Sequence, residues 1–279
     1  MACVKLIAVG GDFQFAVLTN DGKLGVCGKT ETRLWELQHN TDVDIYGLTF
    51  LPGGKTLVAW TADTVIVWSV DIATRTSKRV AESDYDTITR VINTFAANKT
   101  VRIIRVEHVA AMKTTHIIVA TNENTLQRHT ITGSEVTSKT FLSPESPVLA
   151  AVVIDEQYLV ARTATELFTC TDTECNSVRK LHNANSALAH FQNHLMFIDD
   201  NDDPSIITPT CVFIMYGLFP GSVCGPGSWA ESANFVECVG SKVVCVSHGG
   251  RVRVKEAVGA GQQAALEWLM NITCMQSGE

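Results

Sequence analysis

Residues 39–70 alternate between short apolar runs and turn signals, and this order constrains the fold more than any other part of the chain. The segment reads HNTDVDIYGLTFLPGGKTLVAWTADTVIVWSV, in which two apolar runs flank the turn Pro52-Gly53-Gly54. A third apolar run follows a tight corner at Asp63 and contains Trp68. Apolar runs of this length with turn residues between them predict antiparallel strands. The segment is the outline of one blade of a β-propeller.

Cassettes of the same kind recur at intervals of about 40 residues, which is typical of propeller blades. A single small sheet cannot bury both of its faces, whereas sheets stacked around an axis cover one another. We therefore expect an all-β chain in which residues 1–279 form a single propeller of six or seven blades. The six cassettes begin with strands expected at residues 4–10, 45–51, 101–109, 148–154, 187–191 and 234–239.

Two stretches leave room for a seventh cassette, namely residues 84–100 and 205–230. Within the first stretch the apolar residues have helical spacing, although a distorted strand would fit them equally. They are Ile88, Val91, Ile92 and Phe95.

The C-terminal residues 259–279 are the better candidate for a helix. Residues 262–270 are rich in good helix formers, and apolar residues recur there at helical spacing. These are Ala265, Trp268, Leu269 and Ile272. We expect a short helical extension of the propeller domain.

Composition restricts the class of protein. Hydrophobic residues make up 46% and charged residues 18% of the chain, as expected when many strands are buried on both faces. The net charge of −7 disfavours nucleic acid as the default partner. The nine cysteines are scattered without a CxxC pair, which indicates reduced thiols in an intracellular protein, either cytoplasmic or nuclear. The N-terminus lacks the pattern of a signal peptide.

Residues 206–223 are nearly uncharged and invite comparison with a membrane span. Pro209 and Pro220 interrupt the run, and no basic flank follows it. A pair of buried strands is the better interpretation, and no membrane partner is expected.

The cassette at residues 39–70 resembles a repeat of the WD40 family. The run from Phe50 to Lys55 is similar to the family's Phe-Ser-Pro-Asp-Gly-Lys turn, and Trp68-Ser69 stands where the family has Trp-Asp. The resemblance implies a hydrogen-bonded tetrad that holds a loop to the sheet, with a structural and not a catalytic role. Its members here would be His39, Thr61, Asp63 and Trp68.

Two other polar clusters have simple explanations. Three histidines precede an acidic run, and two of them have the HxxxH spacing that places two ligands on one face of a helix. Here the segment reads as strands and a turn, so that geometry fails, and the acidic run lacks the glycine and the terminal glutamate of a calcium loop. A solvated loop is the better interpretation, and no metal or cofactor is expected. The residues are His182, His190, His194, Asp199, Asp200, Asp202 and Asp203.

Arg251, Arg253 and Lys255 alternate with two valines, which places three cations on one face of a strand. An outer strand in water explains this pattern. The alternative is a strip that binds phosphates or an acidic partner.

The resemblance implies a non-enzymatic scaffold or adaptor that binds protein partners through its loops, as a subunit of a larger complex. Two alternatives stay open. One is a non-catalytic subunit of an RNA-modifying or RNA-processing complex, with RNA bound through Arg251, Arg253 and Lys255. The other is a propeller enzyme with a site in the central channel, although no repeated set of polar side chains indicates one.

Overall fold

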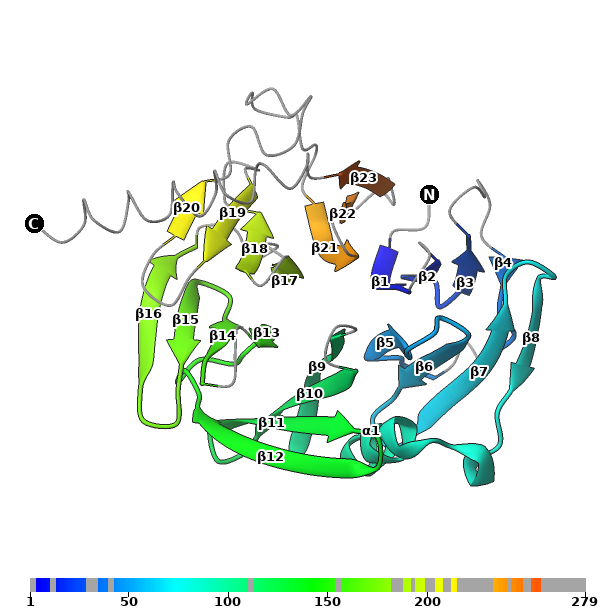
Figure 1. Ribbon diagram of the computed structural model, residues 1–279, viewed down its shortest axis with the longest axis horizontal. Helices are drawn as coiled ribbons and strands as arrows, with labels where there is room; N and C mark the ends of the chain where they lie inside the picture. Colours follow the sequence, from blue (N-terminus) through cyan, green and yellow to red (C-terminus); the bar gives the residue numbers. More distant parts are fainter. Residues whose placement is uncertain are drawn as a thin grey trace, which may run out of the picture.

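The computed structural model of the protein describes residues 4–10, 14–28, 35–39, 43–109, 113–153 and 157–181, and beyond these the backbones of strands up to residue 256. In the described residues the strands form six antiparallel sheets, five of four strands and one of three. The sheets surround a common centre, and the first strand of each lies nearest to it (Figure 1). Within each sheet the strands follow sequence order. The expected all-β propeller is thereby confirmed.

The first three sheets follow the expected cassettes closely. Blade 1 consists of β1 (Val4–Val9), β2 (Phe15–Thr19), β3 (Leu24–Cys27) and β4 (Trp35–Glu36). Blade 2 consists of β5 (Gly47–Phe50), β6 (Thr56–Trp60), β7 (Val65–Asp71) and β8 (Thr76–Arg79). Blade 3 consists of β9 (Val101–Val109), β10 (Thr114–Thr121), β11 (Thr125–Thr132) and β12 (Glu135–Leu142).

The later sheets also begin where the cassettes predict. Blade 4 consists of β13 (Ala150–Val153), β14 (Leu159–Arg162), β15 (Glu166–Cys170) and β16 (Cys175–Lys180). The fifth sheet contains β17 (Leu188–Phe191), β18 (His194–Ile198), β19 (Pro204–Ile207) and β20 (Val212–Ile214). The sixth contains β21 (Ala233–Val239), β22 (Lys242–Ser247) and β23 (Val252–Glu256).

Four blades are described with their side chains, which is fewer than the six or seven expected. The last two sheets are described by their backbones alone. Within residues 206–223, residues 206–207 lie in β19 and residues 212–214 in β20, as expected for strands, and the other residues of the run lie outside the described residues.

A helix replaces the seventh blade considered for residues 84–100. It is α1 (Thr87–Ala97), which follows a single 3-10 turn, η2 (Glu82–Asp84). Asp86 caps the helix, because its carboxylate accepts a hydrogen bond of 2.7 Å from the backbone N–H of Thr89. The helical spacing of the apolar residues was the correct signal, and the alternatives of a blade or a distorted strand were wrong. The helix expected in residues 259–279 lies outside the described residues.

The inner strands of blade 2 are buried on both faces. Leu57 and Ala59 of β6 pack into an apolar cluster shared with blade 1, whereas Val58 and Trp60 pack into a cluster shared with blade 3. This follows from the two-residue period of a strand, which sends neighbouring side chains to opposite faces. Burying a leucine or valine side chain in this way stabilises the fold by roughly 1.5–3 kcal/mol.

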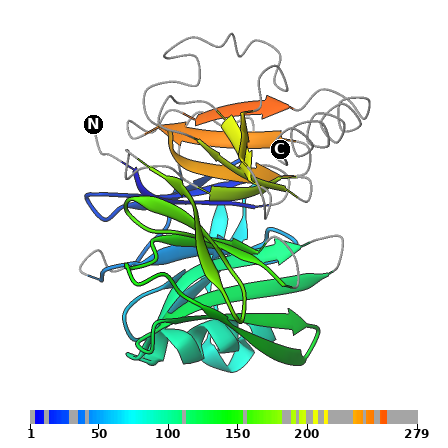
Figure 2. The same cartoon turned by 90° about the vertical axis from the view of Figure 1, so that its left-hand side faces the viewer.

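Helix α1 lies between blades 2 and 3 at the periphery of the ring (Figures 1 and 2). Its buried residues Ile92 and Ala96 belong to the same apolar cluster as Val58 and Trp60. The helix therefore fills the space between two blades, and in the chain it lies in the link between the second cassette and the third.

One face of the propeller collects two kinds of connection. Because adjacent strands of each blade run in opposite directions, the turn from the second strand to the third lies at the same edge as the link to the next blade. We call this side the connecting face. It carries the turn after Trp60 and the link that contains α1. The turns that join the first strand to the second, and the third strand to the fourth, lie on the opposite face.

Candidate functional site

The four residues of the expected tetrad form two separate pairs. The hydroxyl of Thr61 donates to the carboxylate of Asp63 at 3.0 Å. The ring of His39 stands edge-on to that of Trp68, with 6.5 Å between centroids, and Trp68 Nε1 donates to the carbonyl of Gln38 at 3.4 Å. Among the described contacts, none joins the imidazole of His39 to Thr61 or Asp63. The closed tetrad thus stays a prediction.

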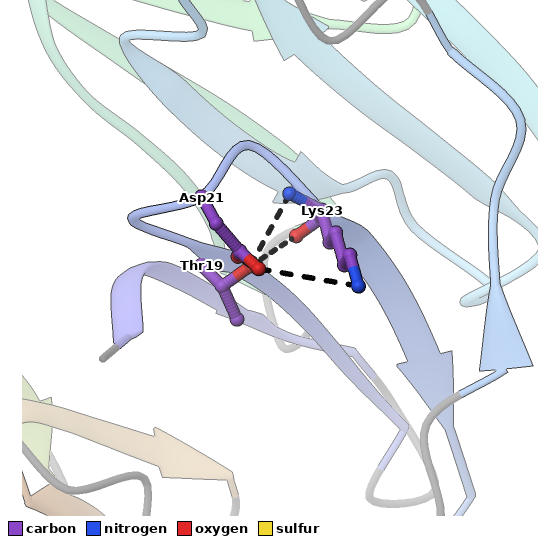
Figure 3. Close-up of polar contacts among 3 residues, drawn as sticks. All are labelled: Thr19, Asp21 and Lys23. Atoms are coloured by element: carbon purple, nitrogen blue, oxygen red, sulfur yellow. Dashed lines mark hydrogen bonds and ion pairs between the residues drawn. The ribbon is translucent and has the colours of Figure 1, made fainter. Parts of the chain in front are cut away.

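In each of the four blades with described side chains, a threonine lies at the end of the second strand or directly after it, and its hydroxyl holds the turn that follows. Figure 3 shows this in blade 1, where Thr19 donates to the Asp21 carboxylate at 2.5 Å and accepts from the backbone N–H of Lys23 at 3.2 Å. The hydrogen bond from Thr19 lowers the pKa of the Asp21 carboxyl below its ordinary value. The threonine thus organises the turn as a side-chain cap.

In each of the other three blades the threonine also accepts a hydrogen bond from a backbone N–H of the turn, here from two or three residues further on. Thr61 accepts from the backbone N–H of Thr64 at 3.2 Å, and Thr163 accepts from that of Glu166 at 3.1 Å. Thr121 accepts from the backbone N–H of Glu123 at 3.3 Å. Of the four threonines, only Thr61 was expected from the sequence. Aligning the ends of the second strands of the cassettes would have identified the other three as the same structural position.

A pocket of about 460 Å³ opens between blades 2 and 3 on the connecting face. Its walls come from the end of β6, the C-terminal end of α1, the start of β9 and the link that precedes β13. All of these segments are connections or strand ends that lie on the connecting face. The residues that define its character are Tyr46, Trp60, Phe95, Lys99, Arg102 and Leu149.

Two apolar side chains of this pocket are exposed to an unusual degree. Tyr46 is 59% exposed and Leu149 is 46% exposed, and they are two of the four large hydrophobic side chains that are exposed in the described part of the chain. Tyr46 precedes β5 and Leu149 precedes β13, so both lie in links that lead into the first strand of a blade. Neighbouring exposed apolar side chains mark a surface suited to binding.

The charged residues of the pocket are all cations. Lys99 and Arg102 line the pocket, and its described lining contains no acidic side chain. Arg102 also donates a hydrogen bond from Nη2 to the backbone carbonyl of Val148, next to Leu149. This bond ties the first strand of blade 3 to the link into blade 4, and the exposed guanidinium keeps further donors for a ligand.

The cationic strip expected at the C-terminal end is described only in part. Arg253 and Lys255 lie in β23, opposite Cys245 and Val243 of β22. They are two positions apart, which places them on one face of the strand. Arg251 lies outside the described residues, so the strip stays a prediction.

The structure brings no metal-binding cluster together in the part of the chain that it describes. No group of three or more His, Cys, Asp or Glu side chains is arranged to hold an ion there. Of the residues weighed as ligands, His190 lies in β17 and His194 in β18. His182 and the acidic run at residues 199–203 lie outside the described residues.

Cys170 and Cys175 form a contact that was not expected from the sequence. They are directly opposite each other in β15 and β16, and their Sγ atoms are 3.3 Å apart. The hydrogen bond between the thiols, together with burial, raises the pKa of Cys170, and the same bond lowers the pKa of Cys175. Cys175 is therefore the more readily ionised thiol of the pair.

No helix in the described ranges has both the length and the apolar character needed to cross a membrane. No family model and no curated protein matches the sequence.

Solved structures do share the architecture. A chain of the Mitotic Checkpoint Complex is similar with a TM-score of 0.57 and 10% identity, over 91% of this chain and 87% of that chain. The C-terminal WD40 domain of Sif2 is similar with a TM-score of 0.52 and 11% identity, over 92% of this chain and 82% of that chain. The protein therefore has the fold of a WD40 β-propeller.

Proposed function

We propose that the protein is a non-enzymatic scaffold, a subunit of a larger complex, which binds a protein partner through its connecting face. The observation that carries this proposal is the exposure of Tyr46 and Leu149 beside one pocket on that face. Leaving large apolar side chains in water is unfavourable, and a protein partner that covers them recovers that free energy. A rigid ring with binding residues in its connections is suited to this role.

We further propose that the ring has six blades. In support, the first strands of the later sheets contact one another in order, β13 with β17 and β17 with β21, and β21 contacts β1. These contacts would close the ring between the last sheet and the first. A closed ring holds the connections of all blades in fixed relative positions, which favours a scaffold.

The solved structures agree with the scaffold proposal as far as the fold allows. One similar chain comes from a protein assembly, the Mitotic Checkpoint Complex. At 10% identity this similarity concerns the fold alone, so the proposal depends on the surface of this chain.

Site-specific photo-crosslinking in the native host tests the proposal. A photoreactive amino acid is introduced at exposed Ala62 or Glu123 on the connecting face, and at exposed Ala73 or Ser134 on the opposite face. We expect crosslinks to a protein from the first pair and not from the second. Crosslinks from the opposite face alone, or crosslinks to RNA in place of protein, would contradict the proposal.

A further inference from the structure

We propose that the pocket between blades 2 and 3 binds a peptide segment of the partner in which bulky apolar side chains are flanked by carboxylates. This inference rests on the proposed scaffold function and names the chemistry of its ligand.

The apolar part of the ligand follows from the walls. Trp60 and Phe95 line the pocket, and the exposed side chains of Tyr46 and Leu149 lie at its border with solvent. A volume of about 460 Å³ is small for a ligand pocket, since such pockets span roughly 300–1,000 Å³. It suits one or two large side chains of a peptide. Aromatic and aliphatic anchors of this kind supply much of the affinity of protein interfaces.

The acidic part follows from the charges. Lys99 and Arg102 line the pocket, whereas the protein as a whole has a net charge of −7. Lys99 is exposed, and no ion pair with an acidic residue engages it in the described part of the chain. Two cations at a pocket without an acidic side chain attract carboxylates and repel a basic peptide. An arginine in addition can bind a carboxylate through two parallel hydrogen bonds.

The pocket is organised before a ligand arrives. The bond from Arg102 to the carbonyl of Val148 limits the movement of the guanidinium. Asn98 holds the turn after α1, because its side-chain oxygen accepts from the backbone N–H of Thr100 at 3.0 Å and from its hydroxyl at 2.8 Å. This turn contains Lys99. Groups that are already ordered lose little conformational entropy on binding.

Fluorescence anisotropy with synthetic peptides tests the inference. The probe is a labelled hexapeptide with Leu-Phe between two pairs of Glu, and the comparison peptides replace either the Glu residues by Lys or the Leu-Phe by Ser-Ser. We expect the intact protein to bind only the acidic, apolar peptide, with an affinity that falls as salt is added.

Charge reversal at the pocket should weaken binding selectively. We expect Lys99→Glu to raise the Kd of the acidic peptide by about tenfold or more, since it replaces an attraction by a repulsion. Lys55→Glu makes the same change of charge at an exposed lysine between β5 and β6, on the opposite face, and should leave the Kd unchanged. Tyr46→Ser, at an exposed position, should also weaken binding while the fold stays intact by circular dichroism.

The outcomes separate this inference from the scaffold proposal. No binding of the acidic peptide, or equal effects of Lys99→Glu and Lys55→Glu, would overturn the peptide chemistry. If the connecting face nevertheless formed crosslinks to a protein, the scaffold proposal would stand. If the connecting face formed no crosslinks to a protein either, both the peptide inference and the scaffold proposal would be overturned.

Discussion

Gly47 and Trp60 are directly opposite each other in β5 and β6, and the indole of Trp60 fills the space that any side chain at Gly47 would need. A Cβ atom at position 47 would lie 1.9 Å from Cζ2 of Trp60. The absence of a side chain at Gly47 thus lets the indole lie across the first strand of the blade, where it lines the pocket. Position 47 therefore requires glycine because of its packing against the indole of Trp60, and not because of a turn.

Replacing Gly47 by alanine should destabilise the protein by about 1–3 kcal/mol, because the added methyl group displaces a buried ring. Urea unfolding measures the change in the free energy of unfolding. The control is the same replacement in a Trp60→Leu background, where the methyl group has room and the added cost should shrink. An equal cost in both backgrounds would show that the indole is not the cause.

The threonines that hold the turns should each contribute to stability through their hydroxyl groups. Thr61 is buried, so Thr61→Val keeps the shape of the side chain while it removes bonds to Asp63 and to the backbone of Thr64. We expect a loss of about 1 kcal/mol in the free energy of unfolding. Thr61→Ser retains the hydroxyl and should lose less. The prediction fails if the valine variant is as stable as the serine variant.

The stability should fall as the pH drops below about 6.5, the ordinary pKa of histidine. Burial lowers the pKa of His129, whose ring lies on Phe95 of α1 with 4.5 Å between centroids. The unfolded chain then binds a proton at a pH where the folded chain does not, so protonation favours unfolding. Burial lowers the pKa of His108 in the same direction.

Urea unfolding at pH 7 and at pH 5 measures this dependence. The His129→Gln variant should show a smaller loss between the two values, and the remaining loss should include the contribution of His108. A variant with the same pH dependence as the original protein would show that His129 does not titrate as expected.

Oxidised glutathione should join Cys170 and Cys175 in a disulfide. The Cys175 thiolate attacks the reagent and releases one reduced glutathione, and the Cys170 sulfur, after losing its proton, displaces the second. The net change is two thiols lost and two glutathione thiols formed. Intact mass spectrometry should show the loss of two hydrogens, and a thiol count should show the loss of two thiols.

The Cys175→Ser variant is the control for this reaction, because it lacks the more acidic thiol and should not form the crosslink. The prediction would be contradicted if the thiol count of the original protein stayed unchanged after treatment with an excess of oxidised glutathione.

The strands could be predicted from the sequence because their signal is local. The turn at Pro52-Gly53-Gly54 and the apolar runs beside it predicted β5 and β6 within two residues. Helix α1 was harder, since spacing alone allowed a strand; the cap at Asp86 was the additional local signal.

The pocket could not be predicted in the same way. Tyr46, Lys99 and Leu149 are far apart in the sequence, and only the stacking of blades brings them to one edge. Their exposure also depends on which face of the ring each link occupies. The turn threonines are an intermediate case, because their pattern is local but each copy is too short to stand out without the others.

Affinity purification from the native host, with the bound proteins quantified by mass spectrometry, tests the central claim most directly. The original protein is compared with Lys99→Glu and Lys55→Glu. We predict that a specific partner is recovered with the original protein and with Lys55→Glu, and is strongly depleted with Lys99→Glu. Equal recovery with both variants would contradict the claim that the pocket on the connecting face binds the partner.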